Sequence, residues 1–262
     1  MGFDLENNNG FWKIHGVSYR DNIQPVDLKK RLLRPMTQDE CVEYSSKRLK
    51  DNRFIVADMP LHHSIFTTLF RNSSGEHRGN IEKIRKFLDD SMRRGITNST
   101  RIEYYQEMDI VVHNYAMPDQ CVISEDIVGP DEFVKDSTNQ AVYKALLGAE
   151  DRKEINAVYK WISGSNPLLM RINEKQKLKG YKTKFKGDKR VARFVVNSGT
   201  ACFICYGDPQ RLDYRLGVRY SVNVGGTAQE SYTPQQISTV LKKIEFSELE
   251  NILISELGKT SK

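Results

Sequence analysis

The chain has 262 residues and a mass of 30.2 kDa, enough to bury a hydrophobic core without disulfide or metal staples. Its cysteines, Cys41, Cys121, Cys202 and Cys205, lack the spacing of a secreted disulfide scaffold, so a reducing compartment is the simpler interpretation. The N-terminal residues do not resemble a signal peptide, and no segment has the roughly twenty apolar residues of a membrane span. We therefore expect no membrane span, and a cytoplasmic location by default.

The formal net charge of +6 and the pI near 9.0 raise the possibility of an acidic partner such as nucleic acid. Seven lysines fall between Lys175 and Lys189, with Tyr181 and Phe185 among them. A solvated loop is the simpler interpretation of such a run. Phosphate binding by the basic loop at 175–190 is the alternative, because aromatic side chains between basic ones can stack on bases.

Helix signals dominate the first two thirds of the chain. The capping box Thr37-Gln38-Asp39-Glu40 predicts a helix over about 38–50. Apolar residues at helical spacing predict two more helices, one opened by Pro60 and one ending near Gly95. Two shorter helices are predicted to end at Gly148 and Gly164, because glycine readily adopts the positive φ that closes a helix.

Strand signals form two groups. Residues 109–113 and 120–123 flank a turn-like segment and predict a hairpin. After the lysine-rich segment, short β-like runs at 191–196, 201–206 and 216–224 predict a compact antiparallel unit. Capping boxes at 233–236 and 247–250 then predict two amphipathic helices that dock on the core or on a second subunit. The fold class is therefore α+β.

Metal-binding patterns are weak. His62 and His63 are adjacent, so on a helix they point about 100° apart and cannot clamp one ion. Cys202 and Cys205 have zinc-knuckle spacing, but no second pair of ligands follows at a suitable distance. In a strand these two thiols would also face opposite sides of the sheet. We expect no metal and no cofactor.

Catalytic patterns are equally weak, and we expect no enzyme. A hydrolase using His113 with Asp109 or Asp119 is one hypothesis, but a lone histidine in a strand is more often a structural hydrogen-bonding residue. Gly225-Gly226-Thr227 lacks the lysine of a phosphate-binding loop.

The segment from Arg193 to Arg219 has an unusual composition. Within 195–215, only Gln210 lies outside the amino acids encoded by codons that end in a pyrimidine, and Lys, Glu, Met and Trp are missing. Randomising the adenines of Asn-type codons would leave this composition, and a short β segment could also lack these residues by chance.

The framework of this segment resembles the variable region of diversity-generating retroelement target proteins, in particular a group found in small-genomed archaea and bacteria. The resemblance extends over about 35–219 and departs at 168–173, where a more aromatic run is expected, and beyond 219, where the chain continues. The residues that carry it in the segment are Arg193, Phe194, Ser198, Ala201, Cys205, Pro209 and 216–219. Upstream landmarks are Asp58-Met59-Pro60-Leu61-His62-His63, His113-Asn114-Tyr115, Val128-Gly129-Pro130-Asp131, Ala145-Leu146-Leu147-Gly148 and Val158-Tyr159-Lys160-Trp161.

The resemblance implies a C-type-lectin-like domain over 35–226, with short antiparallel strands and flanking helices, between an N-terminal extension at 1–34 and a C-terminal helical extension at 227–262. It implies a non-enzymatic protein that binds a protein or surface ligand through a hypervariable, solvent-exposed face, with Tyr206, Tyr214 and Arg211 as energetic anchors. The variable positions would be Val195, Asn197, Gly199, Thr200, Cys202, Ile204, Tyr206, Gly207, Asp208, Arg211, Leu212, Asp213 and Tyr214.

Scaffold roles follow from the same resemblance. Phe194, Ala201 and Leu216 would pack inward, and Cys205 would be a small buried hydrophobe. Pro209 is expected to fix the loop, Gly217 to permit a close backbone approach, and Arg219 to pair internally.

Overall fold

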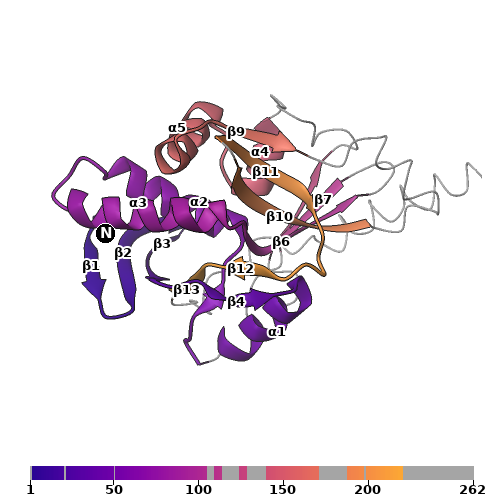
Figure 1. Ribbon diagram of the computed structural model, residues 1–262, viewed down its shortest axis with the longest axis horizontal. Coiled ribbons are helices and arrows are strands. Elements are labelled where there is room, and N and C mark those ends of the chain that lie inside the picture. Colours follow the sequence, from indigo (N-terminus) through magenta and orange to yellow (C-terminus); the bar gives the residue numbers. More distant parts are fainter. Residues whose placement is uncertain are drawn as a thin grey trace, which may run out of the picture. The chain divides into compact units, whose positions relative to one another are not determined.

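The computed structural model describes residues 2–20, 22–49, 51–104, 109–113, 124–128, 140–170, 188–197 and 199–220 (Figure 1). The chain divides into two compact units, Met1–Val222 and Asn223–Lys262, and all described residues belong to the first. This unit is mixed α+β. The predicted C-terminal helices and the domain boundary at 226 lie outside the described residues. None of the described helices is long and apolar enough to cross a bilayer.

A five-stranded antiparallel sheet joins the start of the chain to the end of the first unit. Its strand order is β1 (Leu5–Asn8), β2 (Phe11–Tyr19), β3 (Asn22–Lys29), β13 (Gly217–Tyr220) and β5 (Ile55–Val56). The residues expected as an N-terminal extension thus supply three strands of this sheet, and Trp12 and Ile14 enter the main core. The first unit therefore begins well before residue 35.

An eight-stranded mixed sheet carries the segment of interest. Its main path, in order, is β4 (Leu33–Met36), β12 (Asp213–Arg215), β6 (Ile96–Tyr104), β10 (Asp188–Asn197), β11 (Thr200–Gly207) and β9 (Pro167–Met170). Off this path, β7 (Asp109–His113) pairs with β6 and with β8 (Ser124–Val128). The predicted strand at 109–113 is confirmed and has an antiparallel partner, but that partner is β8, and 120–123 lie outside the described residues.

The five helices of the described chain follow the predicted positions: α1 (Gln38–Leu49), α2 (Met59–Arg71), α3 (Arg78–Arg93), α4 (Gln140–Leu147) and α5 (Arg152–Ser163). The capping box of α1 is formed, because the Thr37 amide donates to Glu40 Oε2 at 2.9 Å and the Glu40 amide donates to Thr37 Oγ1 at 3.2 Å. Gly148 and Gly164 have φ values of +67° and +80° after α4 and α5.

The main core lies between these helices and the two sheets. Helix α2 packs against β2, β6, α4 and α5, and α3 packs against β10 and α5, as Figure 1 shows. Helix α1 instead covers a small separate cluster of Leu33, Met36, Cys41 and Val56. The core thus supports the sheets from the helical side and leaves the outer sides of the strands for other contacts.

Candidate functional site

The β10–β11 hairpin is the centre of the region in which the sequence predicts a variable surface. Its strands pair antiparallel from Asn197 and Thr200 back to Val191 and Gly207, with an irregularity between Val191 and Arg193. β6 pairs with the other edge of β10, and β9 pairs in parallel with the other edge of β11. Because neighbouring strands hold the hairpin on both sides, its backbone position depends little on its outward side chains.

The inner side of the hairpin is part of the main core. Phe194 and Phe203 are 5.1 Å apart between ring centroids, and Tyr159 of α5 lies 4.7 Å and 4.6 Å from them. Burial raises the pKa of the Cys205 thiol well above its ordinary value. The inward packing predicted for the framework is confirmed, since the core includes Ala192, Phe194, Val196, Ala201, Phe203, Cys205 and Leu216.

The outer side of the hairpin carries the alternate residues. Val195 pairs with Cys202 across the strands, and Ile204 pairs with Arg193. Both Val195 and Ile204 lie on the opposite side from the core residues Phe194 and Phe203. Their side of the strand is as predicted, but their exposure is not, since Val195 is 6% and Ile204 is 8% exposed.

Other outer positions are open to solvent to different degrees. Asn197 is exposed, whereas Cys202 is partly buried. Tyr206 is partly buried and contacts the main core with part of its ring. The outer side therefore grades from a covered centre to an exposed end at the β10–β11 turn.

The turn and the loop after β11 are the most exposed parts of the segment. Gly199 has a φ of +82° and no atom within 4 Å of an added Cβ, and Thr200 beside it is exposed. Beyond β11 the exposed side chains are Asp208, Gln210, Arg211, Leu212 and Tyr214. Leu212, at 62% exposed, and Tyr214, at 37%, are unusually open for apolar side chains.

Asp213 differs from the prediction. Its side chain is 6% exposed and lies 3.1 Å from Arg211 Nε and 3.8 Å from Arg193 Nη1. Desolvation lowers the pKa of Arg193, while the charge of Asp213 acts in the opposite direction. We therefore assign Asp213 to the scaffold, because a buried carboxylate between two guanidinium groups is costly to replace.

The neighbours of Asp213 show how β12 divides its side chains. Asp213 and Arg215 are buried while Tyr214 is exposed, so Tyr214 points to the opposite side of the strand. Arg215 Nη2 donates to the Met36 carbonyl at 2.9 Å and ties this strand to β4.

Gly207 is the second position at which the prediction fails for a steric reason. A Cβ at this residue would lie 2.8 Å from the Val191 carbonyl oxygen, which belongs to the paired backbone of β10. Any side chain there requires the strands to move apart. Gly207 is also buried, so we remove it from the set of residues that can vary freely.

The framework positions Pro209 and Arg219 make contacts that agree with their expected roles, whereas Gly217 is approached by side chains. The Pro209 carbonyl accepts a hydrogen bond from the Gln38 amide at 2.9 Å, which fixes the loop to the start of α1. A Cβ at Gly217 would lie 3.2 Å from the Leu33 side chain and 3.3 Å from that of Lys29, so neighbouring side chains leave little room for a larger residue there. Arg219 pairs internally, with Nε and Nη2 at 2.8 Å and 2.6 Å from Asp27 Oδ2.

His113 has a structural environment. It is 2% exposed, its Nδ1 lies 2.9 Å from Thr100 Oγ1, and its Nε2 lies 2.8 Å from the Ala145 carbonyl oxygen. Both ring nitrogens are thus engaged between β6 and α4, as expected of a structural histidine. Asp109 is also buried, and Asp119 lies outside the described residues.

Metal-ligand patterns do not converge in the described part of the chain, where no three His, Cys, Asp or Glu residues are grouped suitably for an ion. Cys202 and Cys205 face opposite sides of β11, as predicted. His62 stacks on Phe66, and His63 stacks on Tyr159. Burial lowers the pKa of each of these histidines to about 4.

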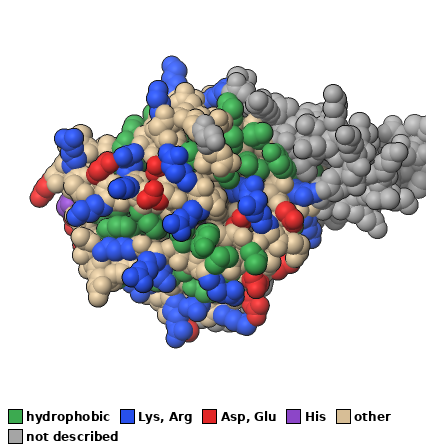
Figure 2. Space-filling view, in the orientation of Figure 1, with side chains coloured by type: hydrophobic (Ala, Val, Ile, Leu, Met, Phe, Trp, Pro, Cys, Tyr) green, Lys and Arg blue, Asp and Glu red, His purple; other side chains and the backbone are tan. Residues whose placement is uncertain are grey.

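The basic loop of the nucleic-acid alternative lies largely outside the described residues, which include only 188–190 of residues 175–190. On the face drawn in Figure 2, Lys and Arg side chains are scattered and interspersed with Asp and Glu instead of forming one basic stripe. A cavity of about 300 Å³ lies elsewhere, lined by Ser73, Ser74, Arg78, Ile81, Glu82 and Trp161. Its lining includes none of the predicted variable residues.

Comparison of the chain with models of protein families, with curated proteins and with solved structures finds no match in any of the three.

Proposed function

We propose that this protein is a non-enzymatic binding protein whose ligand surface is diversified by a retroelement. The surface consists of the outer side of the β10–β11 hairpin, its turn and the loop that follows β11. The observation that carries the proposal is the division of one continuous segment between core and solvent. Phe194 and Phe203 are 2% and 0% exposed, whereas Leu212 and Tyr214 are 62% and 37% exposed. Such a segment can change its exposed side chains while its core contacts keep the backbone in place.

The proposal includes a C-type-lectin-like fold for the first unit. The mixed sheets, the short antiparallel strands and the flanking helices support it at the level of fold class. Framework residues Pro209 and Arg219 also make internal contacts of the kind that the resemblance implies. The fold is thus a rigid support for a set of replaceable side chains.

The burial of Val195, Ile204, Gly207 and Asp213 narrows the proposed variable surface. Within it, Tyr214 and Arg211 have the side chains that most often anchor interfaces, and Leu212 adds exposed apolar area. The proposed contact residues are Asn197, Gly199, Thr200, Cys202, Tyr206, Asp208, Arg211, Leu212 and Tyr214.

The retroelement part is tested by the DNA beside the gene. We expect a near-copy of the segment that encodes 195–215, differing from it at adenines, close to a reverse transcriptase gene. Differences should fall at codons of exposed residues such as Thr200 and Leu212 and spare those of the core residues Ala201 and Phe203. If neither the copy nor the reverse transcriptase is present, the diversification proposal is wrong.

The binding part is tested with two display libraries of equal size. One varies Thr200, Asp208, Arg211, Leu212 and Tyr214, and the matched library varies exposed residues of α1 such as Glu43 and Lys47. Selection against a panel of immobilised proteins should yield folded binders from the first library only. Equal yields from both libraries would contradict a dedicated surface at β10–β11.

The same binders separate this function from nucleic-acid binding. Recognition through tyrosine and leucine side chains should change little when salt rises from about 50 to 200 mM, whereas phosphate contacts lose affinity steeply over that range. A steep loss of affinity for short DNA duplexes by the unselected protein would favour the nucleic-acid alternative.

A further inference from the structure

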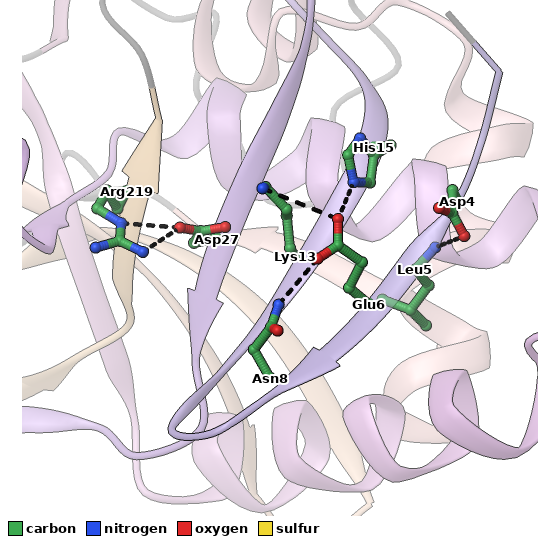
Figure 3. Close-up of polar contacts among 8 residues, drawn as sticks. All are labelled: Asp4, Leu5, Glu6, Asn8, Lys13, His15, Asp27 and Arg219. Carbon is green, nitrogen blue, oxygen red and sulfur yellow. Dashed lines mark hydrogen bonds and ion pairs between the residues drawn. The ribbon is translucent and has the colours of Figure 1, made fainter.

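Four charged residues form a row across the five-stranded sheet, with alternating sign from strand to strand. Glu6 of β1 is paired in register with Lys13 of β2, Lys13 with Asp27 of β3, and Asp27 with Arg219 of β13. Figure 3 shows the four side chains in this order. The row therefore reads negative, positive, negative, positive, and we call it the charge row.

The charge row lies on the side of the sheet away from the core. Its members alternate along their strands with core residues, which are Leu5, Trp12, Ile14, Val26, Leu28 and Val218. The side chains of Glu6, Lys13 and Arg219 are 43%, 38% and 32% exposed, and that of Asp27 is 10% exposed. Most of the row is therefore accessible at the surface of the described structure.

Contacts within the chain hold the row in place as two pairs. Arg219 places two guanidinium nitrogens on Asp27 Oδ2 at 2.6 Å and 2.8 Å, and Lys13 Nζ lies 3.9 Å from Glu6 Oε1. Glu6 also accepts from Asn8 Nδ2 at 3.2 Å and lies 2.7 Å from His15 Nε2 (Figure 3). These contacts lower the pKa of Glu6, with the hydrogen bond to His15 as the largest cause.

Aromatic side chains lie beside the arginine end of the row. Phe11 and Phe54 are 6.1 Å apart between ring centroids, and the Arg219 guanidinium lies 5.1 Å and 5.0 Å from them. Both rings are partly buried. The four charges of the row cancel, and beside them Lys29 Nζ lies 5.7 Å from the Phe54 ring centroid. This face thus combines the row with one further cation and with the apolar and cation–π surface that is common at interfaces.

We propose that this face binds a second copy of the chain, in a two-fold symmetric, face-to-face pairing of the two sheets. The charge pattern is the reason. A two-fold axis along the strand direction, passing between β2 and β3, reverses the order of the row in the partner. Glu6 then faces the partner's Arg219, and Lys13 faces the partner's Asp27. Every charge in the row meets its opposite, which is the self-complementarity that an isologous interface requires.

The dimensions suit this pairing. Neighbouring strands are about 4.8 Å apart, so a row over four strands spans roughly 14 Å, and packed sheets lie about 10 Å apart, within reach of long charged side chains.

The whole chain carries a net charge of +6, so two copies repel in most orientations. The charge row has no net charge and is self-complementary in the proposed orientation. Among the possible orientations of two copies, electrostatics therefore favour the one that pairs the two charge rows.

Self-association would also serve the proposed function, and this consequence rests on that function. A dimer carries two variable surfaces, and two linked binding sites raise the apparent affinity for a repetitive target without any new contact. A failure of the dimer to form would leave single-site recognition unaffected, so the two proposals can be separated.

The decisive variant exchanges one pair of charges in the full-length chain. Glu6→Lys with Lys13→Glu keeps the net charge and the ion pair within the chain, but it changes the row to positive, negative, negative, positive. In the two-fold arrangement, like charges then face each other at all four positions. Sedimentation velocity should show a concentration-dependent dimer for the wild-type protein and at least a tenfold higher dimer dissociation constant for the variant.

Two further variants control this comparison. Glu43→Lys with Lys47→Glu exchanges a more exposed ion pair on α1, whose Oε1 and Nζ atoms are 2.5 Å apart, and should leave the dimer unchanged. Adding Asp27→Arg and Arg219→Asp to the first exchange makes the row positive, negative, positive, negative, and this variant should dimerise again. Melting temperatures report whether each variant is folded.

A wild-type protein that sediments as a monomer at all accessible concentrations would overturn the proposal and leave this face to another occupant. A dimer that survives the Glu6 and Lys13 exchange with an unchanged dissociation constant would also overturn it, because the interface would then lie elsewhere. Loss of the dimer in that variant, with the α1 exchange unaffected, supports the charge row as the interface.

Discussion

The two sides of the β10–β11 hairpin belong to the same two strands but have opposite relations to the rest of the protein. The inner side packs on α5, where Phe194 and Phe203 both contact Tyr159. The outer side, its turn and the following loop end in exposed residues such as Thr200 and Leu212. A strand can thus separate stability from recognition between neighbouring residues, because alternate side chains point in opposite directions.

The helical core that supports the inner side should be sensitive to acid, because His63 of α2 stacks on the Tyr159 ring that contacts Phe194 and Phe203. His62 and His63 of α2 are buried, and burial lowers the pKa of each from near 6.5 to about 4. The unfolded chain therefore binds protons first as pH falls. Stability due to the neutral rings is fully present above about pH 6.5 and is lost progressively down to about pH 4, by about 3 kcal/mol for each histidine.

Urea unfolding at a series of pH values measures this loss. The control is His62→Gln with His63→Gln, in which the dependence between about pH 6.5 and pH 4 should become much shallower. Carboxylates contribute equally to the pH dependence of both proteins, so the difference between the two curves isolates the effect of the histidines. Parallel curves would mean that these rings are protonated without unfolding.

The next effect comes from the aromatic contact beneath the hairpin. Phe203→Ala removes a fully buried ring that lies 4.6 Å from Tyr159 and 5.1 Å from Phe194 between centroids. We expect a loss of about 3 to 5 kcal/mol in the free energy of unfolding, measured in urea. Phe203→Leu should lose less because it leaves a smaller cavity. A loss below about 1 kcal/mol in the free energy of unfolding of the alanine variant would show that the inner side does not stabilise the hairpin.

A pair of glycine variants sharpens the boundary between the two sides. Gly207→Ala places a Cβ 2.8 Å from the Val191 carbonyl oxygen, so we expect a cost of about 1 to 3 kcal/mol as the strands shift. In Gly199→Ala the new Cβ meets no atom within 4 Å, and only the φ of +82° is unfavourable for alanine. We expect this strain to cost about 1 kcal/mol in the free energy of unfolding. Thermal and urea unfolding of both variants test the order. If Gly207→Ala is the milder change, position 207 returns to the variable set.

Local patterns predicted much of this fold. The helix ends were readable because Thr37 and Glu40 form a capping box and Gly164 closes α5, and both are short-range signals. The strands β10 and β11 were found from β-branched and aromatic runs separated by a Gly-containing turn. In each case the residues that decide the structure lie within a few positions of one another.

The N-terminal strands were missed although a local signal existed. Asn9 and Gly10 connect β1 to β2, Gly10 has a φ of +86°, and Asn-Gly between two strands is the strongest short hairpin signal. Trp12 and Ile14 also alternate with Lys13 in the pattern of a half-buried strand. Pairing of β3 with β13 could not be read in this way, because it joins residues about 190 positions apart.

At the candidate surface, too, the sequence predicted local features but not long-range contacts. Alternation gave the correct side of the strand for Val195 and Ile204, but it gives no information on what covers that side. Asp213 reads as an exposed turn residue until its ion pair with Arg193, from a different strand, is known. Side-chain direction is a local property, whereas burial depends on tertiary contacts, so the prediction failed at the positions where distant segments meet.

Replacement of an exposed side chain in the loop after β11 should change stability least. Leu212 is 62% exposed, so Leu212→Ala should change the free energy of unfolding by less than about 0.5 kcal/mol. Asp213→Asn, one residue away, is the matched control. It should cost clearly more, because it leaves the largely buried guanidinium group of Arg193 beside a neutral side chain. Urea unfolding of both variants measures the difference between neighbours. Equal costs would mean that the loop after β11 is uniformly packed, and the division between scaffold and replaceable side chains would not extend to it.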